Sequence, residues 1–143
     1  MKELVLGIWL GIQAGIDFKY KEIPLWFSVL GGILGICFCI KEERTVIEVV
    51  ISCLPGIVAI GFSWITKEIM GYGDGIVLVV LGLYLSISEI MSLGMLAFGI
   101  AGIVALFMLV VLRKGRNYRI PFIPFLEIAY VIYWVTEWGE KVA

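Results

Sequence analysis

The 143-residue sequence contains no histidine, and this absence removes several classes of enzyme. Hydrolysis by Ser-His-Asp or Cys-His groups needs an imidazole base, and catalytic zinc sites nearly always use histidine ligands. The three cysteines, Cys37, Cys39 and Cys53, form no Cys-x-x-Cys pair, so a structural zinc site is excluded as well. All three lie inside apolar stretches, which favours buried small side chains over ligands or disulfides. Any catalysis must therefore rest on carboxylates, lysine, tyrosine or the backbone, with no metal.

Charged residues are also scarce, with 11 Lys+Arg against 12 Asp+Glu and a net charge of −1. This balance favours neither a nucleic acid nor an acidic partner. Hydrophobic residues make up 62% of the chain, against about 45–50% in soluble domains. Mean hydropathy is +1.06, and a chain this short cannot hide so much apolar surface from water. The sequence predicts one integral membrane domain over residues 1–143, in contact with the lipid bilayer.

Six apolar stretches predict an all-α protein with about six transmembrane helices. The first and fourth are shorter than the roughly 20 residues that span a bilayer, and one extra turn beyond the adjacent aspartate restores the length. We expect the first stretch to be retained, because no small-x-small cleavage site precedes Asp17. The stretches cover residues 4–16, 23–40, 46–65, 76–87, 93–112 and 120–135.

Two aspartates stand at the edges of these stretches. Asp17 ends the first, and Asp74 precedes the fourth within Met70-Gly71-Tyr72-Gly73-Asp74-Gly75-Ile76. An ionisable residue at the edge of a hydrocarbon layer is costly and usually functional. Gly71 and Gly73 would let the backbone turn tightly and let another segment approach the carboxylate closely. Helices 1 and 4 cross in opposite directions, so both aspartates are expected at the same depth.

Two carboxylates that share a desolvated site cannot both ionise easily, so one keeps its proton. The ionised partner can deprotonate water while the protonated one polarises a peptide carbonyl, which is aspartic protease chemistry and needs no cofactor. A purely structural interpretation is that Asp74 is a helix N-cap and that Asp17 pairs with Lys19 or Lys21. Spacing alone leaves both interpretations open.

The distribution of lysine and arginine predicts the orientation. Seven of these residues fall on the side that carries Asp17 and Asp74, and four fall on the other. The excess places both aspartates on the cytoplasmic side of the cell membrane and both termini outside. The seven are Lys19, Lys21, Lys67, Arg113, Lys114, Arg116 and Arg119.

Small residues predict where helices approach each other. Gly7-x-x-x-Gly11-x-x-x-Gly15 forms a stripe along the first helix that ends near Asp17, and such spacing permits close helix contact. Gly31 and Gly35 repeat the pattern on the second helix, where we expect simple packing. Glu127 lies inside the sixth stretch, either as a partnered interior carboxylate or as a group that tunes the site.

Three motifs together resemble those of the type IV prepilin and preflagellin leader peptidases, which are intramembrane aspartyl proteases of the Gly-x-Gly-Asp group. The first is Asp17-Phe18-Lys19-Tyr20-Lys21-Glu22-Ile23-Pro24, an aspartate followed by basic residues and an Ile-Pro step. The second is the Gly-x-Gly-Asp unit itself, residues 71–74. The third, Ile120-Pro121-Phe122-Ile123-Pro124-Phe125-Leu126, is similar to a late segment of Pro-Phe-x-Pro-Phe-Leu type.

This resemblance implies an endopeptidase that cuts the short basic leader from prepilin-like or preflagellin-like precursors at the cytoplasmic membrane face. Asp17 and Asp74 would be the catalytic pair, and Gly71 and Gly73 would shape the backbone beside Asp74. The paired Cys-x-x-Cys motifs of larger bifunctional members are missing, so a short, peptidase-only form is expected. Lys19 and Pro24, which lie in the first motif, and Glu127, from its place in the sixth stretch, are the candidates for support of the substrate or the site.

Two other functions remain open on the sequence alone. A different Gly-x-Gly-Asp protease, acting within transmembrane segments like the signal peptide peptidases, would share the aspartate pair, although those relatives usually carry Tyr-Asp where Ile16-Asp17 stands. A small transporter or ion-coupled channel could also use membrane aspartates, but no convincing inverted repeat is present. For a peptidase, motion of the 66–75 segment is an attractive hypothesis for how the aspartates open to a peptide.

Overall fold

The computed structural model of the chain describes residues 1–66, 71–113, 115 and 120–143. Over these ranges the chain forms six α-helices and no strand, as the six apolar stretches predicted. The helices are α1 (Lys2–Tyr20), α2 (Leu25–Lys41), α3 (Val46–Ile65), α4 (Tyr72–Tyr84), α5 (Ile87–Val110) and α6 (Ile123–Val142).

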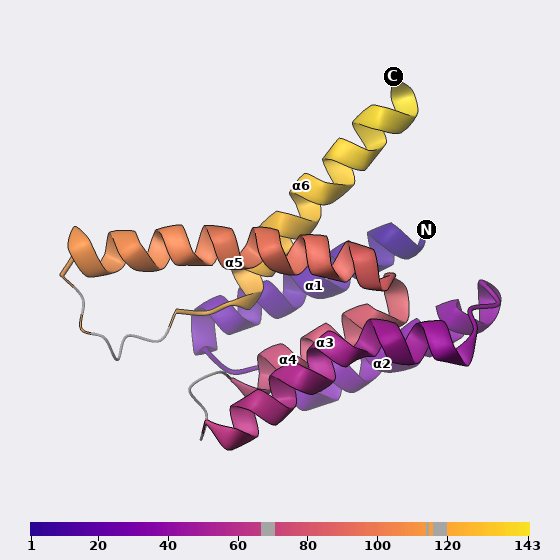
Figure 1. Cartoon of the computed structure of the whole chain (residues 1–143), viewed down its shortest axis with the longest axis horizontal. Coiled ribbons are helices and arrows are strands. Elements are labelled where there is room, and N and C mark those ends of the chain that lie inside the picture. The colour runs from indigo at the N-terminus through magenta and orange to yellow at the C-terminus, as the bar shows by residue number, and fades with distance from the viewer. Residues whose placement is uncertain (67–70, 114, 116–119) are drawn as a thin grey trace.

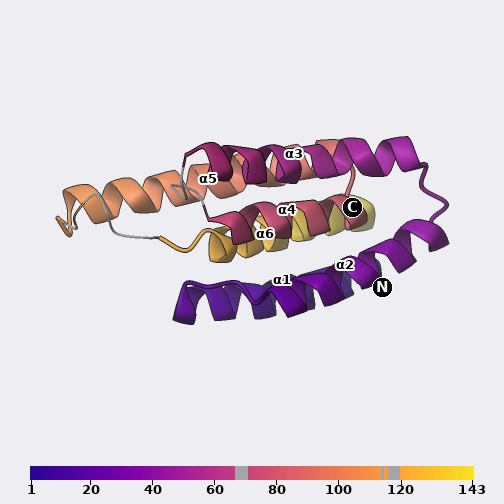
Figure 2. The ribbon, with the colours of Figure 1, turned by 90° about the horizontal axis from the view of Figure 1, so that it is seen from below.

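The helices form three layers, which Figure 2 shows from the side: α3 with α5, then α4 with α6, then α1 with α2. The middle layer makes the main contacts, because α4 packs between α3 and α2 while α6 packs between α5 and α1. In Figure 1 the C-terminal half of α6 rises away from the other helices. The middle helices α4 and α6 therefore connect the two outer layers.

The buried core is a single cluster of apolar side chains from α1, α4, α5 and α6. Helix α4 is enclosed along most of its length, and its Tyr84 is 1% exposed while its hydroxyl donates to the Gly31 carbonyl at 2.8 Å. Burying that hydroxyl costs little because it has an acceptor. The largest fully buried apolar side chains are Tyr84, Leu6, Leu10, Leu81, Leu93, Ile123, Leu126 and Val77.

The outer surface is rich in large apolar side chains, as expected of a protein surrounded by lipid. Trp26 on α2, Trp64 on α3 and Ile103 on α5 are among those that are mostly exposed. Soluble monomers rarely expose apolar patches of this extent. Among the described helices, α3 with 20 residues and α5 with 24 are long and apolar enough to cross a membrane.

Helix α4 is shorter than the sequence predicted. The expected extra turn before Asp74 is missing, because α4 starts at Tyr72 and has 13 residues. At 1.5 Å per residue it is about 20 Å long, against about 30 Å of hydrocarbon. Its start is set by Gly71, and its end by Leu85, whose extended backbone leads into α5. Helix α1 does extend past its aspartate, by three residues, before it ends at Lys21 in the left-handed conformation.

Arg44, in the link between α2 and α3, covers the C-terminal end of this short helix. Its guanidinium donates to the carbonyls of Leu83 at 3.0 Å, Leu85 at 3.1 Å and Gly82 at 3.3 Å. The fourth acceptor is the Ser52 hydroxyl on α3, at 3.0 Å. The last carbonyls of a helix lack partners within it. A cation there is also stabilised by the negative end of the helix dipole. Arg44 therefore replaces water at a buried helix end.

Arg44→Met is expected to lower the free energy of unfolding by about 2 kcal/mol, because it leaves these carbonyls without donors in a largely apolar setting. Thermal unfolding of the purified protein in detergent measures this loss. Lys41→Met, which removes an exposed cation at the end of α2, is the matched control and should unfold like the unchanged protein. Equal unfolding of the two variants would contradict the role assigned to Arg44.

The three cysteines are free thiols that lie in the apolar interior or face outward. The thiol of Cys39 donates to the Leu83 carbonyl at 2.9 Å, and that of Cys53 to the Val79 carbonyl at 3.5 Å. The interpretation of the cysteines as buried small side chains holds best for Cys53, whereas Cys37 is exposed. Cys39 on α2 and Cys53 on α3 therefore both help to hold α4 between these two helices.

Candidate active site

Asp17 is buried in the last turn of α1, with 5% of its surface exposed. Its Oδ2 accepts a hydrogen bond from the backbone amide of Ile123, the first residue of α6, at 3.2 Å. Its own carbonyl accepts from the Lys21 amide at 2.8 Å, which closes the helix. The suggested neighbour Lys19 is exposed, with its ammonium 5.2 Å from the ring centre of Tyr20. Asp17 is thus tied to the start of the last helix.

Asp74 lies in the first turn of α4 and is partly exposed. The N-cap interpretation of this residue is wrong, because the N-cap is Gly71 and Asp74 is the third helical residue. Its amide donates to the Gly71 carbonyl at 3.2 Å. A carboxylate in the first turn of a helix is stabilised by the helix dipole.

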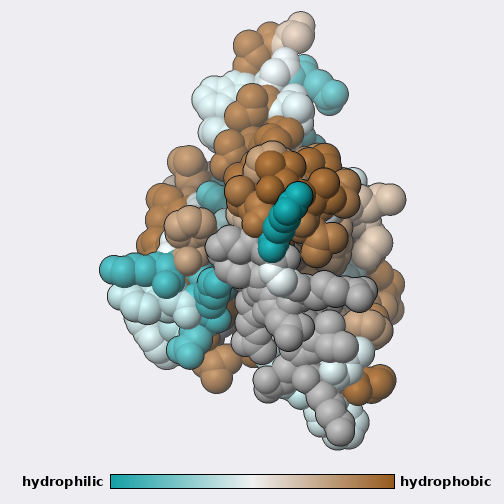
Figure 3. Space-filling view, turned by 90° about the vertical axis from the view of Figure 1, so that its left-hand side faces the viewer, coloured by the Kyte–Doolittle hydropathy of each residue, from teal (hydrophilic) through white to brown (hydrophobic). Residues whose placement is uncertain are grey.

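The two aspartates lie at the same end of the molecule. Figures 1 and 2 both show the C-terminal end of α1 beside the N-terminal ends of α4 and α6. Because these helix ends adjoin, a negative charge on Asp17 would disfavour one on Asp74. Figure 3 looks onto this end, where hydrophilic surface gathers on the left and hydrophobic surface lies above and to the right. The position of this end at the cytoplasmic face stays a prediction from the charge count.

The glycines around Asp74 allow close packing rather than a tight turn. No described glycine has a positive φ, and Gly71 is in an ordinary extended conformation, so the tight-turn explanation is wrong for these residues. A Cβ added at Gly73 would lie 2.8 Å from the Cβ of Ile23, just before α2. One added at Gly75 would lie 3.0 Å from the backbone nitrogen of Ile60 on α3. The first turn of α4 is therefore held between two neighbouring segments.

The glycine stripe on α1 faces α6, as the spacing predicted for a close helix contact. A Cβ at Gly7 would lie 3.4 Å from the ring of Tyr130, and one at Gly11 would lie 3.3 Å from Oε1 of Glu127. A Cβ at Gly15 would meet no atom of another described element within 4 Å, so the stripe ends one step earlier than expected. The Tyr130 hydroxyl also donates to the Glu3 carbonyl at 3.0 Å. This interface positions Asp17 against α6.

Glu127 lies in this α1–α6 interface, half-buried, and not beside the aspartate pair. Its Oε2 is enclosed and accepts no hydrogen bond within the part of the chain that the structure describes. The predicted interior carboxylate is therefore found, but without the partner that was expected. Glu127 lies opposite Gly11, and Gly11 precedes Asp17 by six residues on α1.

Sequence reasoning missed Gln13, a polar side chain that is fully buried one turn before Asp17 on α1. Its Nε2 donates to the Ser28 hydroxyl at 2.9 Å, and that hydroxyl donates to the Pro24 carbonyl at 3.4 Å. Pro24, implied by the resemblance as site support, is the N-cap of α2. The available signal was a lone amide side chain in an apolar stretch. This chain of contacts fixes the start of α2 against α1.

Part of the predicted mobile segment falls outside the described ranges. Residues 67–70 are not described, and neither are Lys114 and residues 116–119, so the structure places none of Lys67, Lys114, Arg116 and Arg119 from the charge count. Residues 72–75 belong to α4, so this part of the 66–75 segment is helical rather than a loop.

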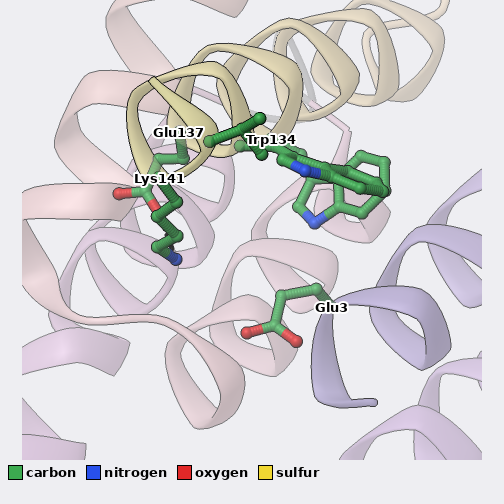
Figure 4. A pocket seen from close by; sticks show the side chains of 6 residues that line it. Glu3, Trp134, Glu137 and Lys141 are labelled. Carbon is green, nitrogen blue, oxygen red and sulfur yellow. Dashed lines mark hydrogen bonds and ion pairs between the residues drawn. The ribbon is translucent and has the colours of Figure 1, made fainter.

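A pocket of about 320 Å³ lies at the other end of the molecule, between the start of α1 and the end of α6 (Figure 4). The rings of Trp134 and Trp138 meet edge to face with centres 5.1 Å apart, and Lys141 donates to Glu137 at 3.3 Å. Glu3 faces them across the pocket. Tryptophan and lysine together are typical of a membrane–water interface. This pocket is separate from the aspartate pair.

The segment that contains both aspartates matches a known protein family. A model of the type IV leader peptidase family matches residues 4–110, more than half of the 143 residues. The chain belongs to the type IV leader peptidase family. It is therefore an aspartic peptidase of the prepilin peptidase type, and its apolar helices are those of an integral membrane protein. Separate searches of curated proteins and of solved structures found no significant match.

The match to the leader peptidase family contains the Gly-x-Gly-Asp unit as well as Asp17. It ends before the segment 120–126, so the resemblance of that segment to the family stays a prediction. Membership supports a peptidase over the transporter that the sequence left open. Over the described ranges, no group of three Cys, Asp or Glu residues stands together in a way that could hold a metal ion.

Proposed function

We propose that this leader peptidase cleaves the short basic leader from a prepilin-like or preflagellin-like precursor at the cytoplasmic membrane face. Asp17 and Asp74 are the catalytic residues of the proposal. The observation that supports it is that the helix ends that carry these two aspartates adjoin at one end of the bundle, within a chain whose family performs prepilin-type cleavage. The precursor's leader junction would reach this end from the cytoplasm.

The aspartate pair has what peptide hydrolysis without a cofactor requires. One carboxylate takes a proton from water, whose oxygen attacks the peptide carbonyl, while the other carboxyl donates a proton to the carbonyl oxygen. Like charges at short range favour this division, because the pair is most stable with one proton. The packing of Gly73 against Ile23 and of Gly75 against Ile60 fixes the helix turn that presents Asp74.

Co-expression with a prepilin tests the proposal directly. The precursor should shorten by its leader on a gel when the peptidase is present, and mass spectrometry of the product should place the cut just before its hydrophobic segment. A precursor that keeps its full length would refute the proposal. Cleavage inside the hydrophobic segment would instead favour the signal-peptide-peptidase type of activity.

Cleavage is also expected to be independent of metal ions, because the proposed proton transfers use carboxylates alone. The measurement is the rate of leader removal by the purified enzyme before and after dialysis against a strong chelator. The two rates should agree within error. A rate that falls with the chelator and returns on addition of a divalent cation would contradict the mechanism.

A further inference from the structure

The first amide of α6 is directed at Asp17. Helix α6 begins at Ile123, and the first amides of a helix have no acceptor within it. Pro124 has no amide hydrogen, and the Phe125 amide donates to the Phe122 carbonyl at 3.0 Å. Of these first positions, only Ile123 donates to the aspartate, at 3.2 Å from Oδ2. The amide hydrogen of Ile123 is therefore the one at the start of α6 that is free to bind the Asp17 carboxylate.

This hydrogen bond is buried on both sides. Ile123 is fully enclosed, and Asp17 is 5% exposed. A hydrogen bond from an amide to a carboxylate is stronger in such surroundings than in water. The positive end of the α6 dipole adds to it. Burial by itself disfavours the negatively charged form of Asp17, and these two effects act against that cost.

Asp74 lacks the equivalent donor. Its carboxylate lies in the first turn of its own helix and is partly exposed, and within the described ranges no group donates a hydrogen bond to it. When Asp17 carries the charge, its repulsion favours the protonated form of Asp74. The two members of the pair are therefore not equivalent.

We infer that Asp17 is the base of the pair, that Asp74 is the acid, and that the Ile123 amide is the positioning group that sets this order. The inference rests on the proposed function. Water oxygen bonds to the peptide carbonyl carbon as one water proton moves to Asp17 and the Asp74 proton moves to the carbonyl oxygen. The C–N bond then breaks as nitrogen takes the proton from Asp17 and one hydroxyl of the diol returns its proton to Asp74.

Few other charges act on Asp17 in the described part of the chain. Asp74 lies in the first turn of α4, whose N-terminal end adjoins the C-terminal end of α1. The next titratable group on α6, Glu127, faces Gly11 instead. Lys19, Lys21 and Glu22 follow Asp17 along its own chain and are exposed. Helix α2 carries its one charged side chain at the opposite end. The Ile123 amide is thus the group whose removal should change Asp17 most.

Replacing Ile123 by its α-hydroxy acid analogue in the full chain removes this amide hydrogen and keeps the side chain. With a purified prepilin as substrate, kcat should fall about 10- to 100-fold with little change in KM. The acid limb of the kcat profile should move to higher pH, because Asp17 loses the donor that favours its charged form. The same ester at Phe125 removes a helix hydrogen bond that does not involve Asp17, and should leave the profile unchanged.

Ile123→Val is a second control that uses ordinary mutagenesis, because it keeps the amide and should keep the pH profile of the wild type. If the wild type is active and the ester variant at position 123 keeps the same kcat, the inference is overturned. It is also overturned if that variant is slower but the acid limb of its kcat profile has not moved. A wild type that leaves the prepilin uncut would instead refute the proposed function.

Discussion

Asp17→Asn and Asp74→Asn should each abolish leader cleavage while the protein remains in the membrane. An asparagine keeps the size and most contacts of the aspartate but can neither accept a proton from water nor donate one to a carbonyl. General acid–base groups contribute about 100- to 10,000-fold to rate, so either loss should reduce cleavage below detection on a gel. The measurement is conversion of a co-expressed prepilin, with the membrane level of each variant quantified beside it.

Glu43→Gln is the matched control for these two variants. It removes one negative charge from an exposed residue between α2 and α3, at the opposite end of the molecule from the aspartates. Its cleavage should equal that of the wild type. If Asp17→Asn or Asp74→Asn retains substantial activity at a normal membrane level, that residue is not catalytic.

The second large effect is expected at the contact between α3 and α4, where two glycines bring the backbones together. A Cβ at Gly56 would overlap the backbone of residues 78 and 79, and one at Gly82 would lie 2.7 Å from the Ser52 carbonyl oxygen. Backbone cannot rotate away as a side chain does, so Gly56→Ala and Gly82→Ala must separate the helices. Each should cost about 3 kcal/mol or more, or prevent folding.

Thermal unfolding and size-exclusion chromatography in detergent measure this effect. Gly61→Ala, on α3, is the control, because no atom lies within 4 Å of its added Cβ. Alanine is the better helix former, so this variant should be as stable as the wild type or slightly more so. If Gly56→Ala and Gly61→Ala behave alike, the close approach of α3 and α4 is not required for stability.

Much of the helix pattern could be predicted because it depends on neighbours in the sequence. Helix α3 covers residues 46–65 as predicted, and its start is fixed by a capping box between Thr45 and Glu48. A second capping box, between Ser86 and Glu89, starts α5. Such signals act within one turn of helix, so the sequence alone contains them.

The contacts that define the site could not be predicted in the same way. The Asp17–Ile123 bond joins residues 106 positions apart and uses a backbone amide, which carries no residue type to recognise. Arg44 is one of the four cations on the predicted outer side, and nothing in its sequence surroundings indicates that it caps α4. The length of α4 was overestimated because each apolar stretch was required to span the membrane by itself. Such features depend on the assembled bundle.

The short α4 also bears on how water reaches the scissile bond. Its length of about 20 Å falls about 10 Å short of the hydrocarbon layer, and a bilayer adapts to such a mismatch by thinning. At the far end, the guanidinium of Arg44 already supplies polar contacts. At the near end, the shortfall coincides with the first turn that carries Asp74. In the proposed reaction each turnover consumes one water molecule, and we expect that molecule to reach Asp74 from this end of the bundle.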